Sequence, residues 1–184
     1  MKFILGRKLN MTQVFDKDGI VHPATMVEVS PVIVTQVKTK AKDGYSALQV
    51  SSKKAKLESK KEFRIDEPTQ KLGDSINLSQ FAIGDSVRVS SISKGKGFQG
   101  VVKRHGFGGG PRTHGQKHSE REPGSIGGGL RNKVPKKMRM AGRMGSDRIT
   151  IKNLKIVHID LPSNTLYIGG AIAGKRGTLV EITA

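Results

Sequence analysis

The chain has 184 residues, enough for one domain with a buried core, and its 33 Lys and Arg against 15 Asp and Glu give a formal net charge of +18. This balance favours a polyanionic partner, with nucleic acid as the leading candidate and an anionic membrane surface as the competitor. The absence of cysteine excludes a disulfide framework, a thiolate zinc site and a cysteine nucleophile.

Apolar segments are short throughout the sequence. The chain begins with only three consecutive apolar residues, Phe3 to Leu5, too few for the core of a secretory signal. No apolar run reaches the roughly 18 residues that a membrane-spanning helix needs. We therefore expect a soluble, intracellular protein.

Short runs rich in β-branched residues occur toward both ends of the chain, separated by turn signals such as Asp18-Gly19 and Asp43-Gly44. The predicted strands are 21–29, 32–39, 45–51, 87–92, 149–159, 166–168 and 178–183. This pattern predicts a small all-β domain, and we expect a closed barrel because closure removes exposed strand edges. Residues 53–71 are charged and poor in apolar side chains, and we interpret them as a short polar lobe or mobile connection with one helical turn.

The stretch 94–148 differs from both flanks. It carries 14 Lys and Arg against 3 acidic residues and holds 14 of the 23 glycines, with few large aliphatic side chains. Such a composition supports neither strand alternation nor a helical stripe, so we expect a long loop, which in a compact domain is usually functional or disordered. The predicted organisation is a globular β-barrel domain of residues 1–93 and 149–184, with residues 94–148 inserted as an extended binding loop.

Two motif matches in this loop point to other functions. Gly95 to Gly100 has the spacing of a dinucleotide-binding fingerprint, but we predict no helix and no βαβ unit after it, and both are required. Lys96-Gly97-Phe98 resembles the start of an RNA-recognition-motif strand, which Gln99 and Gly100 interrupt. Aromatic residues make up 4% of the chain, so base stacking cannot be the main binding mode, and folded RNA is favoured over single strands.

Histidines and carboxylates in the loop could also indicate an enzyme. His114 and His118 have the spacing of helical zinc ligands, but Gly115 between them makes a helix unfavourable. Glu120 and Glu122 are expected to pair with Arg121 or Lys117 rather than to take part in a hydrolytic triad. A nucleic-acid-processing enzyme would need a carboxylate cluster, and Glu120, Glu122 and Asp147 are too few and too enclosed by cations for a magnesium site. We predict no catalytic residue, no metal and no cofactor. A membrane-binding protein would need an amphipathic helix, which the sequence does not predict.

Interleaved glycine and cations favour direct contact with phosphate over a merely solvated charged face. Glycine lets the backbone approach a phosphate ribbon, where arginine adds forked donors and lysine a point charge. The candidate RNA-binding side chains are Lys94, Lys96, Lys103, Arg104, His105, Arg112, His114, Lys117, His118, Arg121, Ser125, Arg131, Lys133, Lys136, Lys137, Arg139, Arg143 and Arg148. The glycines expected to approach RNA are Gly95, Gly97, Gly108, Gly109, Gly110, Gly124, Gly127, Gly128, Gly129, Gly142 and Gly145.

Five spaced motifs in this loop carry a resemblance to a known family. They are Ser93-Lys94-Gly95-Lys96-Gly97-Phe98-Gln99-Gly100, Lys103-Arg104, Thr113-His114-Gly115, Pro123-Gly124-Ser125-Ile126-Gly127 and Met140-Ala141-Gly142-Arg143-Met144-Gly145. Together with Gly6 to Thr12 and Thr35 to Lys38, they resemble the bacterial large-subunit ribosomal protein three family, in order and over nearly the whole chain.

This resemblance implies a translation-factor-type β-barrel and a loop that threads ribosomal RNA toward the peptidyl-transferase centre. It also implies early assembly on the 3′ part of the large-subunit rRNA, contacts with ribosomal proteins fourteen and nineteen, and a cytoplasmic location in the ribosome, with no homo-oligomer expected. Compared with many relatives, segment 53–71 is shorter, and the tip at 128–132 is about one residue shorter. The glutamine methylated in some relatives has no counterpart here, so we predict no such modification.

Overall fold

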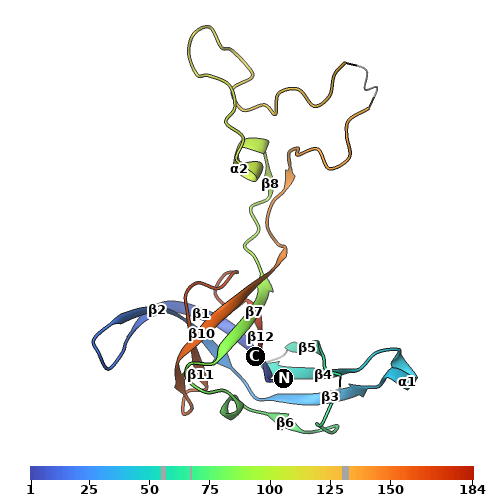
Figure 1. Cartoon of the computed structure of the whole chain (residues 1–184), viewed down its shortest axis with the longest axis vertical. Coiled ribbons are helices and arrows are strands. Elements are labelled where there is room, and N and C mark those ends of the chain that lie inside the picture. Colours follow the sequence, from blue (N-terminus) through green and yellow to red (C-terminus); the bar gives the residue numbers. More distant parts are fainter. Residues whose placement is uncertain (55–56, 67, 130–132) are drawn as a thin grey trace. The chain divides into compact units, whose positions relative to one another are not determined.

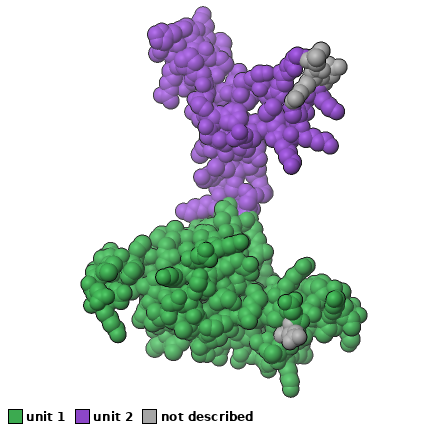
Figure 2. Space-filling view, viewed as in Figure 1, with its two compact units in different colours: residues 1–93, 148–184 green, residues 94–147 purple. Residues whose placement is uncertain are grey.

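The computed structural model describes residues 1–54, 57–66, 68–129 and 133–184. Strands dominate the described residues and the helices are single short turns, which confirms the prediction of a mainly β protein. The chain forms two compact units, residues 1–93 with 148–184 and residues 94–147 (Figure 2).

Six antiparallel strands of the first unit form a barrel (Figure 1). In order around the barrel they are β1 (Phe3–Phe15), β12 (Leu179–Thr183), β7 (Ser86–Ile92), β10 (Arg148–Asp160), β11 (Thr165–Gly169) and β2 (Val21–Val29). Because β1 pairs with both β12 and β2, the ring of strands closes on itself. Alternate residues point inward, so that Val87 and Val89 on β7 and Val180 and Ile182 on β12 are buried.

The first strand, β1, is absent from the predicted set. Its opening residues Phe3, Ile4 and Leu5 are all buried, so they show no alternation between apolar and polar positions. The next residue, Gly6, has to be glycine because a β-carbon there would lie 2.5 Å from Cγ1 of Val27 on the neighbouring strand. A register shift between Lys8 and Met11 then allows the strand to continue as a long hairpin with β2.

A second sheet lies in the same unit and has the order β5-β4-β3-β6. It contains β3 (Val32–Lys38), β4 (Ala47–Lys54), β5 (Leu57–Arg64) and β6 (Ser75–Ile76), with the short helix α1 (Lys40–Asp43) between β3 and β4 and the 3₁₀ turn η1 (Leu78–Gln80) after β6. The predicted strands 32–39 and 45–51 therefore belong to this sheet and not to the barrel. Their buried residues join the barrel core in one apolar cluster that includes Val34, Leu48 and Val50.

The interpretation of residues 53–71 as a polar lobe or mobile connection with a helical turn was wrong for residues 57–64, which form strand β5. This strand pairs with β4 along its whole length, with Phe63 opposite Leu48. The Phe63 ring is buried and packs on Phe3, with ring centroids 4.5 Å apart. Charged residues fill its outer positions because β5 is an edge strand, where charge discourages pairing with other chains.

Candidate nucleic-acid interface

The second unit, residues 94–147, begins and ends in two segments that pair with each other. Strand β8 (Phe98–Gln99) pairs with β9 (Gly142–Arg143), and the Lys96 amide donates to the Met144 carbonyl oxygen at 2.9 Å. Gly145 has a φ of +77°, and a β-carbon there would overlap the Lys94 carbonyl oxygen. Glycine is therefore required at this position by the conformation and packing of the protein itself, whether or not RNA is bound.

A short helix, α2 (Val101–His105), follows the Gly95 to Gly100 motif. The expectation that no helix would follow this motif was wrong, since Gly100 precedes the helix and Gly106, with a φ of +73°, ends it. The helix has only one turn, and every strand pairing in the described residues is antiparallel, so the βαβ context of a dinucleotide site is missing there.

Three of the predicted RNA-binding side chains make contacts at or near helix α2. Arg104 donates from Nη1 to the Met140 carbonyl oxygen at 2.7 Å, and Nε2 of His105 lies 3.0 Å from the same oxygen. The Arg139 guanidinium lies over the Phe107 ring, 5.5 Å from its centroid. These contacts fix α2 against residues 139–142. Gly142 belongs to this arrangement, because a β-carbon there would overlap the Arg104 guanidinium.

A second set of internal contacts holds the two ends of residues 109–120 together. The Gly110 amide donates to the Glu120 carbonyl oxygen at 2.9 Å, and Arg112 Nε lies 2.8 Å from Glu120 Oε1. A β-carbon at Gly109 would overlap the same Glu120 carbonyl oxygen. The expected pairing of Glu120 with Arg121 or Lys117 was therefore wrong. His114 and His118 are exposed in a segment without helix.

The tip of the unit, residues 124–129, has an uncovered backbone. Every one of its residues is exposed, and a β-carbon at Gly127 or Gly128 would have no neighbour within 4 Å. Gly124 and Gly129 have φ of +76° and +64°, a conformation that disfavours other residues. Ser125 donates from Oγ to the Gly127 carbonyl oxygen at 2.7 Å, which holds the turn. Of the predicted side chains, Arg131 lies outside the described residues.

The predicted cations divide into paired and unpaired groups. Arg143 lies 3.8 Å from Asp147, and Arg148 belongs to β10 of the first unit, where it bonds to Glu181. Among the predicted cations that the structure describes, those that are exposed and have neither an ion pair nor a cation–π contact are Lys94, Lys96, Lys103, Lys117, Arg121, Lys133, Lys136 and Lys137. Their charge is thus available to a phosphate. The glycines at 95, 97 and 108 are exposed as well.

Phe98 is a candidate that the reasoning from sequence missed. Its side chain is 76% exposed on β8, between Gly97 and Gly100. An aromatic ring so exposed beside unpaired cations can stack on a base. The low overall aromatic content hid this position, and the signal that could have found it is a single aromatic flanked by glycines within a basic segment.

Other kinds of site were searched for in the described part of the chain. No three His, Asp or Glu side chains gather there as a metal-binding group, and no helix there is long and apolar enough to cross a membrane. A cavity of about 740 Å³ lies in the first unit beside β1, β2 and β10 and has a mainly apolar lining that includes Phe15, Ile83 and Leu154.

Comparisons with known proteins give the family. The family described as Ribosomal protein L3 matches residues 56–167 of the chain. The chain belongs to the ribosomal protein L3 family. It is 42% identical to "Large ribosomal subunit protein uL3" of Herpetosiphon aurantiacus, with 98% of this chain and 94% of that protein aligned. It is 43% identical to the protein of the same name from Chloroherpeton thalassium, over 99% of this chain and 98% of that one.

Another protein of that name, from Dehalococcoides mccartyi, is 41% identical over 97% of this chain and 96% of its own length. The predicted resemblance is therefore confirmed, and membership extends over both compact units. The chain accordingly belongs to a family of structural ribosomal proteins and not of enzymes.

Proposed function

We propose that residues 94–148 bind large-subunit rRNA and shape it, while the barrel anchors them. As a member of the ribosomal protein L3 family, the protein is a structural constituent of the large ribosomal subunit and works in the cytoplasmic ribosome. The observation that carries the proposal is the uncovered tip at 124–129, which exposed Lys133, Lys136 and Lys137 follow closely in the chain.

The mechanism is positioning by backbone and charge. At Gly127 and Gly128 the backbone has no side chain and no protein atom packs against it, so the chain is thin enough to enter an RNA crevice. Exposed backbone amides there can donate hydrogen bonds to phosphate oxygens. Nearby lysines neutralise phosphates and release counterions, which offsets the entropy of ordering a flexible segment. Phe98 adds one stacking contact. The tip contains no acid, base or nucleophile, so its role is to hold RNA in shape.

The family resemblance supports finer expectations within this proposal. The barrel is of the translation-factor type, the protein joins the 3′ part of the rRNA early in assembly, and the tip approaches the peptidyl-transferase centre. Its protein neighbours are ribosomal proteins fourteen and nineteen. The glycines fall into two groups. Gly124 and Gly127 to Gly129 approach RNA, whereas at Gly109, Gly142 and Gly145 a β-carbon would overlap other atoms of the protein.

The test is reconstitution of large subunits with Gly127→Asp or Lys136→Glu, each compared with Lys175→Glu on the exposed surface of the first unit. We expect the Gly127→Asp and Lys136→Glu variants to fold like the wild type. They should nevertheless give fewer complete subunits on sucrose gradients and altered chemical protection of rRNA at the peptidyl-transferase centre. A misplaced negative charge beside phosphate repels it. If Gly127→Asp and Lys136→Glu assemble and protect rRNA as well as the wild type, while Lys175→Glu fails, this placement of function is refuted.

A further inference from the structure

The first unit contains a polar cleft of about 520 Å³ that no residue of the second unit, 94–147, lines. Four cations line it, Arg64 on β5, Arg88 on β7, and Arg148 and Lys152 on β10. Glu62 and Glu181 are the carboxylates in its lining. The hydroxyls of Ser90, Thr150 and Thr183 also face it, and Oγ of Ser90 lies 2.8 Å from Oγ1 of Thr150.

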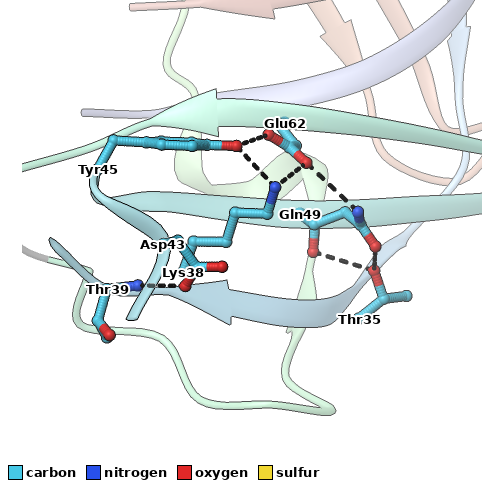
Figure 3. A network of polar contacts seen from close by, with 7 residues as sticks. All are labelled: Thr35, Lys38, Thr39, Asp43, Tyr45, Gln49 and Glu62. Atoms are coloured by element: carbon cyan, nitrogen blue, oxygen red, sulfur yellow. Dashed lines mark hydrogen bonds and ion pairs between the residues drawn. The ribbon is translucent and has the colours of Figure 1, made fainter. Parts of the chain in front are cut away.

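One of the two carboxylates is already bonded on the second sheet. Figure 3 shows that Glu62 contacts both Lys38 and Tyr45, with Lys38 Nζ at 2.7 Å from Oε1 and the Tyr45 hydroxyl donating to Oε2 at 2.9 Å. The hydrogen bond from Lys38 is the main reason that the pKa of Glu62 lies below its ordinary value. Glu62 is thereby neutralised by Lys38 and offers little charge to Arg64.

The other carboxylate orders one of the cations. Glu181 on β12 has a mostly buried side chain, with 13% exposed, and bonds to both Lys61 and Arg148, with Lys61 Nζ at 3.1 Å. Its single negative charge meets two positive ones, so this group keeps a net positive charge. Since Arg148 is held from one side, its remaining donors are pre-oriented at the cleft.

The other two barrel cations are brought together by the fold. The register between β10 and β7 shifts from Ile151 opposite Val89 to Leu154 opposite Val87. Lys152 and Asn153 therefore stand opposite the single residue Arg88 on the outer face. Arg88 donates from Nε to Oγ1 of Thr183 at 3.2 Å, and within the described residues neither Arg88 nor Lys152 has a carboxylate partner.

We propose that this cleft binds a phosphodiester group of RNA, as a second contact separate from residues 94–147. An arginine fork, a lysine point charge and neighbouring hydroxyl donors are the groups that recognise phosphate oxygens. The cleft is a cation-rich concave surface, and its carboxylates are occupied by Lys38, Lys61 and Arg148. The inference rests on the proposed function for the identity of the polyanion as RNA.

The experiment measures binding of the full chain to a large-subunit rRNA transcript over a series of salt concentrations. Arg88→Ala/Lys152→Ala removes two cations from the cleft, and Lys175→Ala/Arg176→Ala removes one lysine and one arginine from an exposed turn of the same unit. Loss of two phosphate contacts makes the salt slope shallower by about 1.5 and weakens binding at least about tenfold at 0.1 M salt. We expect this loss for the cleft pair and not for the turn pair.

A third variant, Lys133→Ala/Lys136→Ala/Lys137→Ala, separates this inference from the proposed function. If the loop variant loses affinity while the cleft pair behaves like the turn pair, the inference fails and the proposed function stands. If only the cleft pair loses affinity, the proposed function fails and the inference stands. Equal losses in the cleft and turn pairs also overturn the inference, because they show a general charge effect.

Lysine acetylation of the wild-type chain keeps the test independent of folding in the variants. Lys152 should be protected when the rRNA transcript is added, and Lys175 should not. A polyglutamate chain of equal charge should leave Lys152 reactive. Protection of Lys152 by polyglutamate to the same degree would indicate an acidic protein surface as the occupant and would overturn the assignment to RNA.

Discussion

Glycines in the basic segment serve two different purposes at the scale of single residues. Gly109 and Gly145 have positive φ, and a side chain at either would overlap a backbone carbonyl oxygen of the same unit. Gly127 and Gly128 have open space around them. The sequence shows all four as equal members of a glycine-rich pattern, because nothing local tells which backbone a distant segment will approach.

The two classes respond differently to alanine. Gly145→Ala adds a side chain in the left-handed region, at a cost of about 1–2 kcal/mol before the overlap with the Lys94 carbonyl oxygen is relieved. We expect the amides of Lys96 and Met144, which bond across the base of the unit, to exchange faster with solvent. Gly127→Ala is the control and should leave both amides protected as in the wild type. Equal exchange in both variants would contradict the distinction.

The proposed binding role of Phe98 can be tested because its side chain is exposed. Phe98→Ala removes a side chain that is 76% exposed, so the stability of the protein should change little. Binding to rRNA should weaken by about 1–3 kcal/mol, the range for loss of one base stacked on an aromatic ring. Phe98→Tyr keeps the ring and should bind like the wild type, as measured by filter binding. Unchanged affinity in Phe98→Ala would remove Phe98 from the interface.

At the scale of elements, most of the barrel strands were predicted well, whereas β1 and β5 were missed. The strand β2 was predicted with the bounds that it has, and β7, β10, β11 and β12 to within one residue at each end, because each shows β-branched residues between turn signals. Strand β1 begins with a continuous buried run, and β5 has charged outer positions typical of an edge. Both patterns depend on pairing partners elsewhere in the chain, which local sequence does not specify.

The polar network on the second sheet predicts a pH dependence (Figure 3). The pKa of Glu62 is held below its ordinary value of 4.5, chiefly by the hydrogen bond from Lys38. A carboxylate with a lowered pKa stabilises the fold above that ordinary value and loses this contribution as pH falls through the folded-state pKa. Stability to urea should therefore fall below about pH 4.5 more steeply in the wild type than in Glu62→Gln.

The same network constrains the alkaline side. Hydrogen bonds to Glu62 and Tyr45 raise the pKa of Lys38 above its ordinary value of 10.5. The charged Lys38 therefore contributes fully to stability below pH 10.5, and this contribution is lost as the pH rises through the folded-state pKa. Asp85, whose pKa is lowered by Lys2, adds to the acid loss in both proteins. Identical acid profiles for the wild type and Glu62→Gln would show that this network does not contribute to stability.

At the scale of the whole molecule, charge and glycine content change along the chain, and we placed the boundaries of the basic segment where they change. The expected break points were 93/94 and 148/149, and the compact units divide at 93/94 and 147/148. The contacts within the candidate site could not be predicted from the sequence. Arg104, His105, Arg139 and Arg112 carry the right chemistry but make internal contacts, which depend on how the segment folds on itself.

Independent folding of the first unit is a prediction of this division. Replacing residues 95–145 with a short linker should leave a folded β domain by circular dichroism, because the apolar core cluster lies entirely in residues 1–93 and 148–184. The shortened protein should bind rRNA more weakly than the full chain. In the full chain without RNA, trypsin should cleave first at the exposed basic residues between 112 and 143. An unfolded deletion protein would show that the core was misplaced.

The salt dependence of rRNA binding tests the central claim, that the basic segment acts through phosphate contacts. The stretch 94–148 has 14 cations, and if about half of them meet phosphates, the slope of log K against log salt should be on the order of −5 to −6. The measurement is a titration of the full chain with a large-subunit rRNA transcript at several salt concentrations. A slope in that range supports the account, and a slope near −1 would contradict it.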